Sequence, residues 1–318
     1  MNISIIVPNY NGEKLLEKNL PTIREAVKNY KDGFVEIIIT DDASSDDSKR
    51  IVEEFFATIH EKHIRCKYIQ NIEKAKRGFS KNVNRGVKSS EGEIVILLNS
   101  DVSPSKDFLS PLLARFSDPS IFAVGCLDQS IENDKVVLRG RGIGRWQRGF
   151  LMHGAGKIGD KNTTLWVSGG SSAFRKSIWE KLSGFDPIYD PFYWEDIDLS
   201  YRALKAGYTI LFEQKSIVRH EHEKGAIKTA FSPSVIKGIA YRNQFIFIWK
   251  NISETNLWIS HLVWLPYHLL KALFRGDTAF FKGLSLAVHK LPKILISRRQ
   301  ARRYFIRKDS IIIKEYSQ

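Results

Sequence analysis

Residues 94–101 read IVILLNSD, five apolar residues followed at once by an amide, a hydroxyl and a carboxylate. The apolar run is continuous rather than alternating, which predicts a strand covered on both faces, as in a parallel sheet. Similar runs lie at residues 3–7, 35–39 and 121–124. Helical patterns over residues 13–30 and 48–60 follow the first two of these runs. This alternation predicts an open α/β sheet with right-handed crossovers.

The composition is that of a globular protein. The chain has 318 residues, of which 43% are apolar, with 10 Pro and 21 Gly, and this excludes disordered and collagen-like classes. Cys66 and Cys126 each lie in an apolar stretch, which favours reduced, buried thiols in a reducing cytosol over a disulfide or zinc scaffold. No export signal is expected at the amino terminus, and no run of about 20 apolar residues predicts a simple membrane span.

Positive charge is concentrated in the last third of the chain. Residues 219–318 hold 18 of the 49 Lys and Arg but only 6 of the 35 Asp and Glu. Two mostly apolar helical segments lie there, at residues 257–274, where Pro266 is expected to introduce a kink, and at 280–296. These segments either pack on the preceding domain or form an oligomer contact, or else they lie in the interface of an anionic membrane. We therefore expect a domain over residues 1–250 and a basic helical region over 251–318.

Polar residues follow the apolar runs directly. They are Pro8, Tyr10 and Asn11 after the first run, Asp41 and Asp42 after the second, and Asn99, Ser100 and Asp101 after the third. In open α/β sheets, ligands bind beyond the carboxyl ends of the strands. Such residues are also common turn formers and helix N-caps, but three polar groups at the same sheet position favour a binding site.

Six motifs occur in a fixed order along the chain. They are IIVPNYNG (residues 5–12), DDASSD (41–46), GFSKNVNRG (78–86), LLNSD (97–101), GGSSAFR (169–175) and WEDIDLSYR (194–202). Over about residues 3–250 this series resembles the inverting family 2 glycosyltransferases of the GT-A fold, in particular a rhamnosyltransferase-like branch. The resemblance implies an open, mostly parallel sheet flanked by helices, with the basic helical region appended at the carboxyl end.

The resemblance also implies a nucleotide pocket at the strand ends. The residues expected to line it are Pro8, Tyr10, Asn11, Asp41, Asp42, Gly78, Asn82, Asn99 and Ser100. Either Asp41 or Asp42 is suited to contact the base or ribose, and the other can cap the helix that begins near Ser48. The sequence leaves open which of the two makes the contact.

The resemblance places Asn99-Ser100-Asp101 where the family has Asp-x-Asp, with the first acid replaced by Asn. One carboxylate is enough for a hard cation that also binds phosphate oxygens, so Asp101 is the expected ligand of Mg²⁺ or Mn²⁺. His220, directly after the strand expected at residues 210–218, matches a family histidine near the metal and diphosphate. His222 is a weaker candidate.

Asp196 matches the general base of the family. The alternative is that the acids at residues 195–198 only complement the dipole of the helix expected near Ile197 and ending at Gly207. Gly169, Gly170, Trp194 and Glu195 are the expected acceptor-side residues. We interpret residues 139–159, which are rich in Gly and Arg, as a flexible loop on the same side.

The resulting hypothesis is a metal-dependent inverting glycosyltransferase for hexosyl or deoxyhexosyl groups. It would move a sugar from a dTDP- or UDP-sugar to a hydroxyl of a glycan or lipid-linked acceptor, in cell-surface polysaccharide assembly, at the inner face of the cell membrane. The alternatives are a non-catalytic basic protein that binds membrane or nucleic acid, and a hydrolase with paired carboxylates. Nucleic acid is not expected because no reader motif accompanies the basic residues. The oligomeric state stays open.

Overall fold

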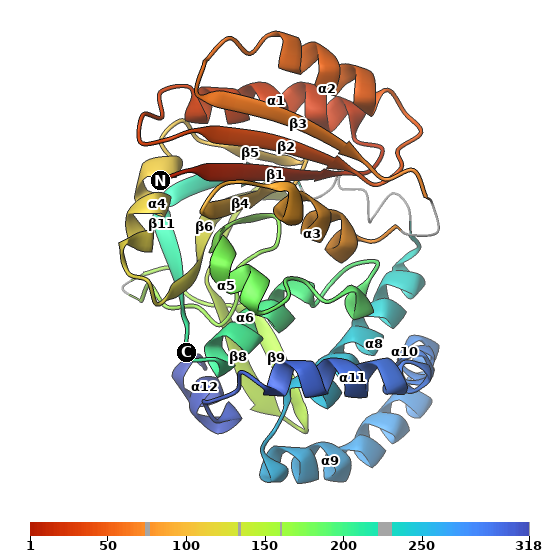
Figure 1. Cartoon of the computed structure of the whole chain (residues 1–318). Helices are drawn as coiled ribbons and strands as arrows, with labels where there is room; N and C mark the ends of the chain where they lie inside the picture. The colour runs from red at the N-terminus through yellow and green to blue at the C-terminus, as the bar shows by residue number, and fades with distance from the viewer. Residues whose placement is uncertain (74–76, 133–134, 160, 222–230, 318) are drawn as a thin grey trace.

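The structure is a computed structural model that describes residues 1–73, 77–132, 135–159, 161–221 and 231–317. A curled sheet with its helices forms the upper part of Figure 1, and the carboxyl-terminal helices form the lower part. The strand order is β3-β2-β1-β4-β10-β6-β11-β5, with β7 paired to β6, and β8 and β9 form a separate hairpin.

The strands are β1 Ile3–Asn9, β2 Val35–Asp41, β3 Ile64–Gln70, β4 Ile94–Leu98, β5 Val102–Pro104, β6 Ile121–Glu132, β7 Lys135–Arg139, β8 Gly142–Gln147, β9 Phe150–Ala155, β10 Ser171–Arg175 and β11 Thr209–His220. The helices are α1 Glu13–Val27, α2 Ser48–Ala57, α3 Phe79–Ser89, α4 Leu109–Ala114, α5 Lys176–Lys181, α6 Glu195–Lys205, α8 Pro233–Asn251, α9 Thr255–Phe274, α10 Thr278–His289, α11 Leu291–Arg302 and α12 Asp309–Glu315. Two 3₁₀ turns, η2 Arg115–Ser117 and η3 Pro187–Tyr189, complete the regular elements.

The first half of the sheet is parallel and covered on both faces. β1 pairs in parallel with β2 and with β4. Ile5 packs in one core with Leu16 and Leu20 of α1, whereas Ile6 packs in the other with Val83 of α3. Successive side chains of a strand point to opposite faces, so a continuous apolar run is what a doubly covered strand requires. The expected α/β fold is confirmed.

The second half of the sheet is mixed, and it sets the position of the candidate site. β10 runs antiparallel between β4 and β6. β11 runs parallel to β6 and antiparallel to the short strand β5, where His220 is the partner of Val102. The end of β11 therefore lies beside the segment that follows β4.

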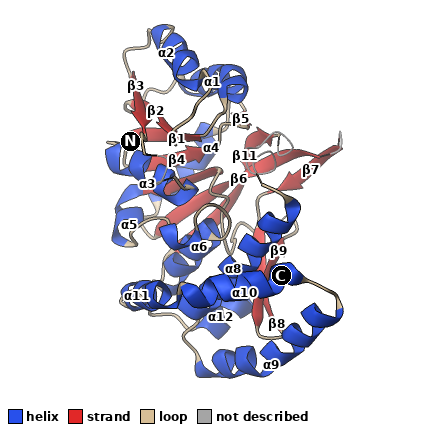
Figure 2. Ribbon diagram, turned by 90° about the vertical axis from the view of Figure 1, so that its right-hand side faces the viewer, coloured by secondary structure: helices blue, strands red, loops and turns tan. Residues whose placement is uncertain are grey.

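The last third of the chain is helical, as expected. α10 and α11 pack against α8. Phe245, Phe280 and Ile312 share one core cluster with Trp194 and Tyr201 of the sheet domain. The carboxyl-terminal helices thus pack on the preceding domain, and α9 lies at the far end from β3 in both views (Figures 1 and 2). α9 is one uninterrupted helix that includes Pro266.

One expectation was wrong. Residues 139–159 contain the β8–β9 hairpin rather than a flexible loop. Its glycines permit close packing: a Cβ on Gly142 would lie 2.3 Å from Nε1 of Trp166, and one on Gly144 would lie 2.3 Å from Cδ2 of Leu165. Both cysteines are free, as expected, with Cys126 buried and Cys66 half-buried.

Candidate active site

The ends of β1 and β2 are joined by hydrogen bonds around Asp41. Asn9 Nδ2 donates to Asp41 Oδ2 over 3.0 Å, and the backbone N–H of Ser44 donates to Oδ1 over 2.9 Å. Ser44 Oγ also accepts a bond of 2.8 Å from the backbone N–H of Asn11. Asp41 is fully buried. It therefore holds the loop with Pro8, Tyr10 and Asn11 against the loop after β2.

Asp42 connects this loop to the start of α3. Its Oδ2 accepts from the backbone N–H of Gly78 over 2.8 Å, and its Oδ1 accepts from Asn71 Nδ2 over 2.9 Å. Gly78 has a φ of +153°, and a Cβ there would lie 2.3 Å from the carboxylate of Asp190. Only glycine fits this approach without displacing the acid.

Arg77 lies beside the residues expected to bind the nucleotide, and the sequence reasoning missed it. Its Nε donates to the carbonyl oxygen of Asp42 over 3.0 Å, and its Nη1 donates to the hydroxyl of Tyr10 over 3.1 Å. The guanidinium carbon also lies 4.6 Å from the centroid of the Tyr10 ring. Arg77 thus brings a cation to the expected nucleotide pocket, and its place directly before Gly78 was the available signal.

Asn82 and Ser100 each form a hydrogen bond with a residue from another segment of the chain. Asn82 Nδ2 donates to the carbonyl of Thr40 over 2.7 Å, so the buried amide supports the end of β2. The carbonyl of Ser100 accepts from Asn19 Nδ2 over 2.7 Å. Asn99 differs, because its Oδ1 is buried and has no hydrogen-bond partner among the described residues.

Asp101 and His220 are close together, and a second acid lies behind the histidine. His220 Nε2 is 3.2 Å from Asp101 Oδ1, and Nδ1 is 2.9 Å from Asp128 Oδ2. Burial alone would lower the pKa of His220, but its hydrogen bonds with Asp101 and Asp128 outweigh this and raise the pKa to about 9. Asp128, on β6, was not identified from the sequence.

These side chains suit a hard divalent cation. A carboxylate, a neutral imidazole and the amide oxygen of Asn99 are suitable ligand groups, so a cation would have to displace the proton that Asp101 and Asp128 stabilise on His220. A carboxylate behind a ligand histidine is a common arrangement in metal sites. Within the ranges that the structure describes, no three His, Cys, Asp or Glu side chains gather closely enough to hold a metal by themselves. Phosphate oxygens would have to complete such a site.

Asp196 stands at the first turn of α6, next to a pair of glycines. Its Oδ2 accepts from the backbone N–H of Gly169 over 3.2 Å, and its Oδ1 accepts from that of Ile197 over 2.8 Å. Burial raises the pKa of Asp196 to about 6, although these N–H groups oppose the shift. The pKa therefore allows the carboxylate to accept a proton close to neutral pH.

The glycine pair joins Asp196 to the loop after β4. The backbone N–H of Asn99 donates to the carbonyl of Gly170 over 2.9 Å. A Cβ on Gly170 would lie 2.4 Å from Nδ2 of Asn99, so a larger residue would displace that amide. One short segment, Gly169-Gly170, thus contacts both the candidate base and the candidate metal loop.

Trp194 and Glu195 precede the candidate base. Trp194 is buried, has a φ of +76°, and packs edge-on against His153 of the β8–β9 hairpin, with centroids 4.8 Å apart. Oε2 of Glu195 is buried and has no hydrogen-bond partner within the described part of the chain. Burial and the adjacent charge of Asp196 raise the pKa of Glu195 well above its usual value. Glu195 thus favours its protonated form more than an exposed glutamate does.

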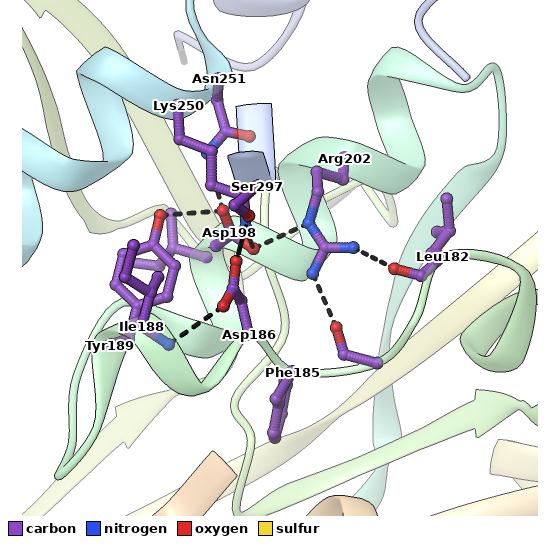
Figure 3. Close-up of polar contacts among 12 residues, drawn as sticks. Leu182, Phe185, Asp186, Ile188, Tyr189, Asp198, Arg202, Lys250, Asn251 and Ser297 are labelled. Atoms are coloured by element: carbon purple, nitrogen blue, oxygen red, sulfur yellow. Dashed lines mark hydrogen bonds and ion pairs between the residues drawn. The ribbon is translucent and has the colours of Figure 1, made fainter. Parts of the chain in front are cut away.

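Asp198 belongs to a buried ionic network with residues of α6 and α8 (Figure 3). Arg202 Nε and Lys250 Nζ each donate to its Oδ2 over 2.8 Å, and the hydroxyl of Tyr189 donates to Oδ1 over 2.8 Å. Burial would raise the pKa of Asp198, but the charges of Arg202 and Lys250 outweigh it and lower the pKa. This network fixes α6 to α8 and was not foreseen from the sequence.

The candidate residues thus form two connected groups. One joins the ends of β1 and β2 to the start of α3, and the other joins the loop after β4 to β11, β10 and the start of α6. Gly12 lies between the two groups. A Cβ built on it would be 2.3 Å from Asn9 Oδ1 in the first group and 3.4 Å from Ser100 Oγ in the second. His222 lies outside the described residues.

Known proteins are similar to this chain in sequence and in fold. Residues 4–183 match the model of "Glycosyl transferase family 2", and residues 94–287 match that of "Glycosyl transferase family group 2". The O-antigen chain rhamnosyltransferase RfbN of Salmonella typhimurium is 27% identical over 234 residues, which are 70% of this chain and 67% of RfbN. A GalNAc(5)-diNAcBac-PP-undecaprenol beta-1,3-glucosyltransferase of Campylobacter jejuni is 32% identical over 142 residues. These residues are 44% of this chain and 43% of that enzyme.

Solved structures agree on the fold. TarS residues 1–349 of S. aureus, in complex with UDP-GlcNAc, superpose with a TM-score of 0.60 at 17% identity, covering 100% of this chain and 90% of TarS. The mannosyltransferase PcManGT of Pyrobaculum calidifontis, in complex with GDP-Man and Mn²⁺, gives a TM-score of 0.56 at 17% identity, covering 99% of this chain and 84% of that one. With more than half of its residues matched by the family model, the chain belongs to glycosyl transferase family 2 and is a glycosyltransferase.

Proposed function

We propose that the chain is a metal-dependent, inverting glycosyltransferase that moves a hexosyl or deoxyhexosyl group from a nucleoside diphosphate sugar to a hydroxyl of a glycan or lipid-linked acceptor. The observation that carries the proposal is the Gly169-Gly170 segment, which bonds to Asp196 on one side and to Asn99 on the other. This segment links a carboxylate with a raised pKa to the loop suited to hold the diphosphate.

For the donor, we assign the nucleotide contact to Asp42. Both carboxylates already accept two hydrogen bonds, but Asp41 is fully buried, whereas Asp42 is 7% exposed. Arg77 lies over Tyr10 and supplies positive charge beside them. UDP- and dTDP-sugars are the proposed donors.

For the metal, Asp101 and His220 would hold Mg²⁺ or Mn²⁺, with Asp128 orienting the imidazole. When bound, the cation would supply positive charge that stabilises the departing diphosphate. The complex of PcManGT with GDP-Man and Mn²⁺ supports this proposal by fold likeness alone.

For the transfer step, the carboxylate of Asp196 would take the proton of the acceptor hydroxyl as its oxygen bonds to the anomeric carbon. The bond from that carbon to the diphosphate oxygen breaks, and its electron pair leaves with the diphosphate. Attack opposite the leaving group inverts the anomeric configuration. Glu195, whose pKa is raised by burial and by the charge of Asp196, would in its protonated form serve as a hydrogen-bond donor on the acceptor side.

We further propose that the enzyme works in cell-surface polysaccharide assembly at the inner face of the membrane. The names of RfbN and of the Campylobacter glucosyltransferase concern an O-antigen chain and a lipid-linked acceptor, which supports this assignment. On α9, Val263, Leu273 and Phe274 are 68%, 64% and 84% exposed. This helix belongs to the region that holds most of the excess positive charge. Among the described residues, no helix has the length and apolar character needed to cross a bilayer.

The test is a screen of purified protein against several UDP- and dTDP-sugars, with Mg²⁺, with Mn²⁺ and with a chelator. We expect slow metal-dependent hydrolysis of one donor, and faster transfer once an acceptor is added. An enzyme that uses a donor equally well in the presence of chelator would contradict the metal requirement. We also propose that residues 1–250 form the glycosyltransferase domain and residues 251–318 the basic helical region.

A further inference from the structure

A groove of about 700 Å³ lies between α11 and the segment from the end of α5 to η3. It is separate from the ends of β1 and β2 that form the proposed nucleotide pocket. α11 crosses the front of the molecule in Figure 1, and its Ser297 reaches Asp186 in Figure 3.

The groove has an excess of positive charge. Six cations line it, namely Lys81, Arg202, Lys250, Lys290, Lys293 and Arg303, but Asp186 is its only lining carboxylate among the described residues. Asp186 is already bonded to Lys250, over 2.7 Å, and to Ser297. Arg202 and Lys250 are also neutralised by Asp198. Lys81 pairs with Asp190 over 4.0 Å, so three cations of the groove remain available to an anion.

Three of these cations have no carboxylate within ion-pair distance in the part of the chain that the structure describes. They are Lys290, Lys293 and Arg303. Lys290 is half-buried and donates to the carbonyl of Ile188 over 2.8 Å. Burial and the nearby charge of Arg242 lower the pKa of Lys290 to about 8. A bound anion would relieve both effects.

Apolar surface continues from the same groove. Ile296, which lines it, is 60% exposed, and Leu295 beside it is 55% exposed. Leu291, one turn earlier on α11, is 40% exposed. An occupant that matches this surface has an anionic group joined to an apolar chain.

We propose that this groove binds the phosphate head group of an anionic lipid, with the lipid chains lying along the exposed apolar residues of α11. The inference rests on the proposed location at a membrane and adds a defined lipid site to it. The site is distinct from the active site, so its occupancy would seat the enzyme on the bilayer without entering the transfer step.

The test uses the full chain and calorimetric titration with dihexanoyl phosphatidic acid as a monomeric lipid probe, and with inorganic phosphate as the head group alone. We expect the lipid to bind at least about 10-fold more tightly than phosphate. The double variant Lys293→Gln/Arg303→Gln, at two exposed positions, should lose about 10-fold or more of the lipid affinity. Lys290→Gln should also weaken binding, whereas Lys282→Gln, on α10 and outside the groove, should bind as the wild type does.

Equal lipid affinity in the wild type and the double variant would overturn the site. Equal affinity for phosphate and lipid would overturn the lipid as its occupant. UDP and dTDP binding with Mn²⁺ is measured on the same samples, and the double variant should keep it. A wild type that binds the lipid but neither nucleotide would contradict the proposed function while supporting the groove as a lipid site.

Discussion

Asp196 and Asp198 lie two residues apart at the start of α6, yet their surroundings shift their pKa values in opposite directions. Among the described residues, Asp196 accepts hydrogen bonds from backbone N–H groups alone, and burial raises its pKa to about 6. Asp198 contacts Arg202 and Lys250, and its pKa is lowered. One acid can thus exchange a proton near neutral pH, while the other is a permanent anion that holds α6 in place.

The pH dependence of transfer should follow Asp196. A general base acts in its ionised form, so kcat/KM should fall as the pH drops through about 6 and reach a plateau above it. The pKa of Glu195 is raised well above its usual value, so an ordinary glutamate titration at about pH 4 to 5 is not expected to shape the acid limb. A profile that stays flat between about pH 5 and pH 7.5 would be incompatible with the raised pKa of Asp196.

Removal of the buried anion should destabilise the fold. Asp198→Asn leaves Arg202 and Lys250 without their shared carboxylate, and breaking one partner of a buried ion pair typically costs about 3–5 kcal/mol. Urea unfolding should show a lower midpoint. Glu53→Gln, which removes the exposed pair of Glu53 with Lys49, is the matched control and should leave the midpoint unchanged. An equal midpoint for Asp198→Asn would refute the structural role of the network.

Nucleotide binding should depend on metal through Asp101. Calorimetry with UDP or dTDP, with and without Mn²⁺, should show that Asp101→Ala abolishes the gain that the metal gives, because it removes the anionic ligand nearest the expected phosphates. His220→Asn should give a milder loss. Asp128→Asn should give the smallest loss, since Asp128 contacts Nδ1 of the imidazole and Asp101 contacts Nε2. A metal effect of full size in Asp101→Ala would exclude Asp101 as a ligand.

Membrane binding should depend on α9 and on lipid charge. Leu273→Ser/Phe274→Ser should reduce co-sedimentation with phosphatidylglycerol vesicles at low salt, since it removes two exposed apolar side chains. The control Val136→Ser/Leu138→Ser alters two exposed apolar residues of β7, a strand far from α9 in the sequence. This variant should co-sediment with the vesicles as the wild type does. Binding that is equal on neutral and anionic vesicles would contradict an electrostatic contribution.

The local parts of this structure could be predicted from the sequence. The continuous runs at residues 3–7 and 94–98 became buried parallel strands, because burial on both faces leaves no polar position in the pattern. α6 begins at Glu195 and ends before Gly207, whose φ of +86° suits glycine. The position of the candidate base at a helix start was therefore accessible from spacing alone.

The contacts between distant segments could not be predicted in this way. His220 meets Asp128 across 92 residues, and Lys250 meets Asp198 across 52. The sequence pattern shows the periodicity of each helix and strand, but it does not show which of them pack against one another. The β8–β9 hairpin was misread for a related reason, because glycines that allow close packing resemble those of a flexible loop.

Transfer by Asp196→Asn, with the preferred donor and acceptor, tests most directly whether Asp196 takes the proton of the acceptor hydroxyl. The side chain keeps its shape but loses its basicity, so the rate should fall by about 10²–10⁴-fold while calorimetry shows donor binding close to that of the wild type. Glu195→Gln, at the adjacent residue, should reduce the rate less. Near wild-type turnover by Asp196→Asn would contradict the account.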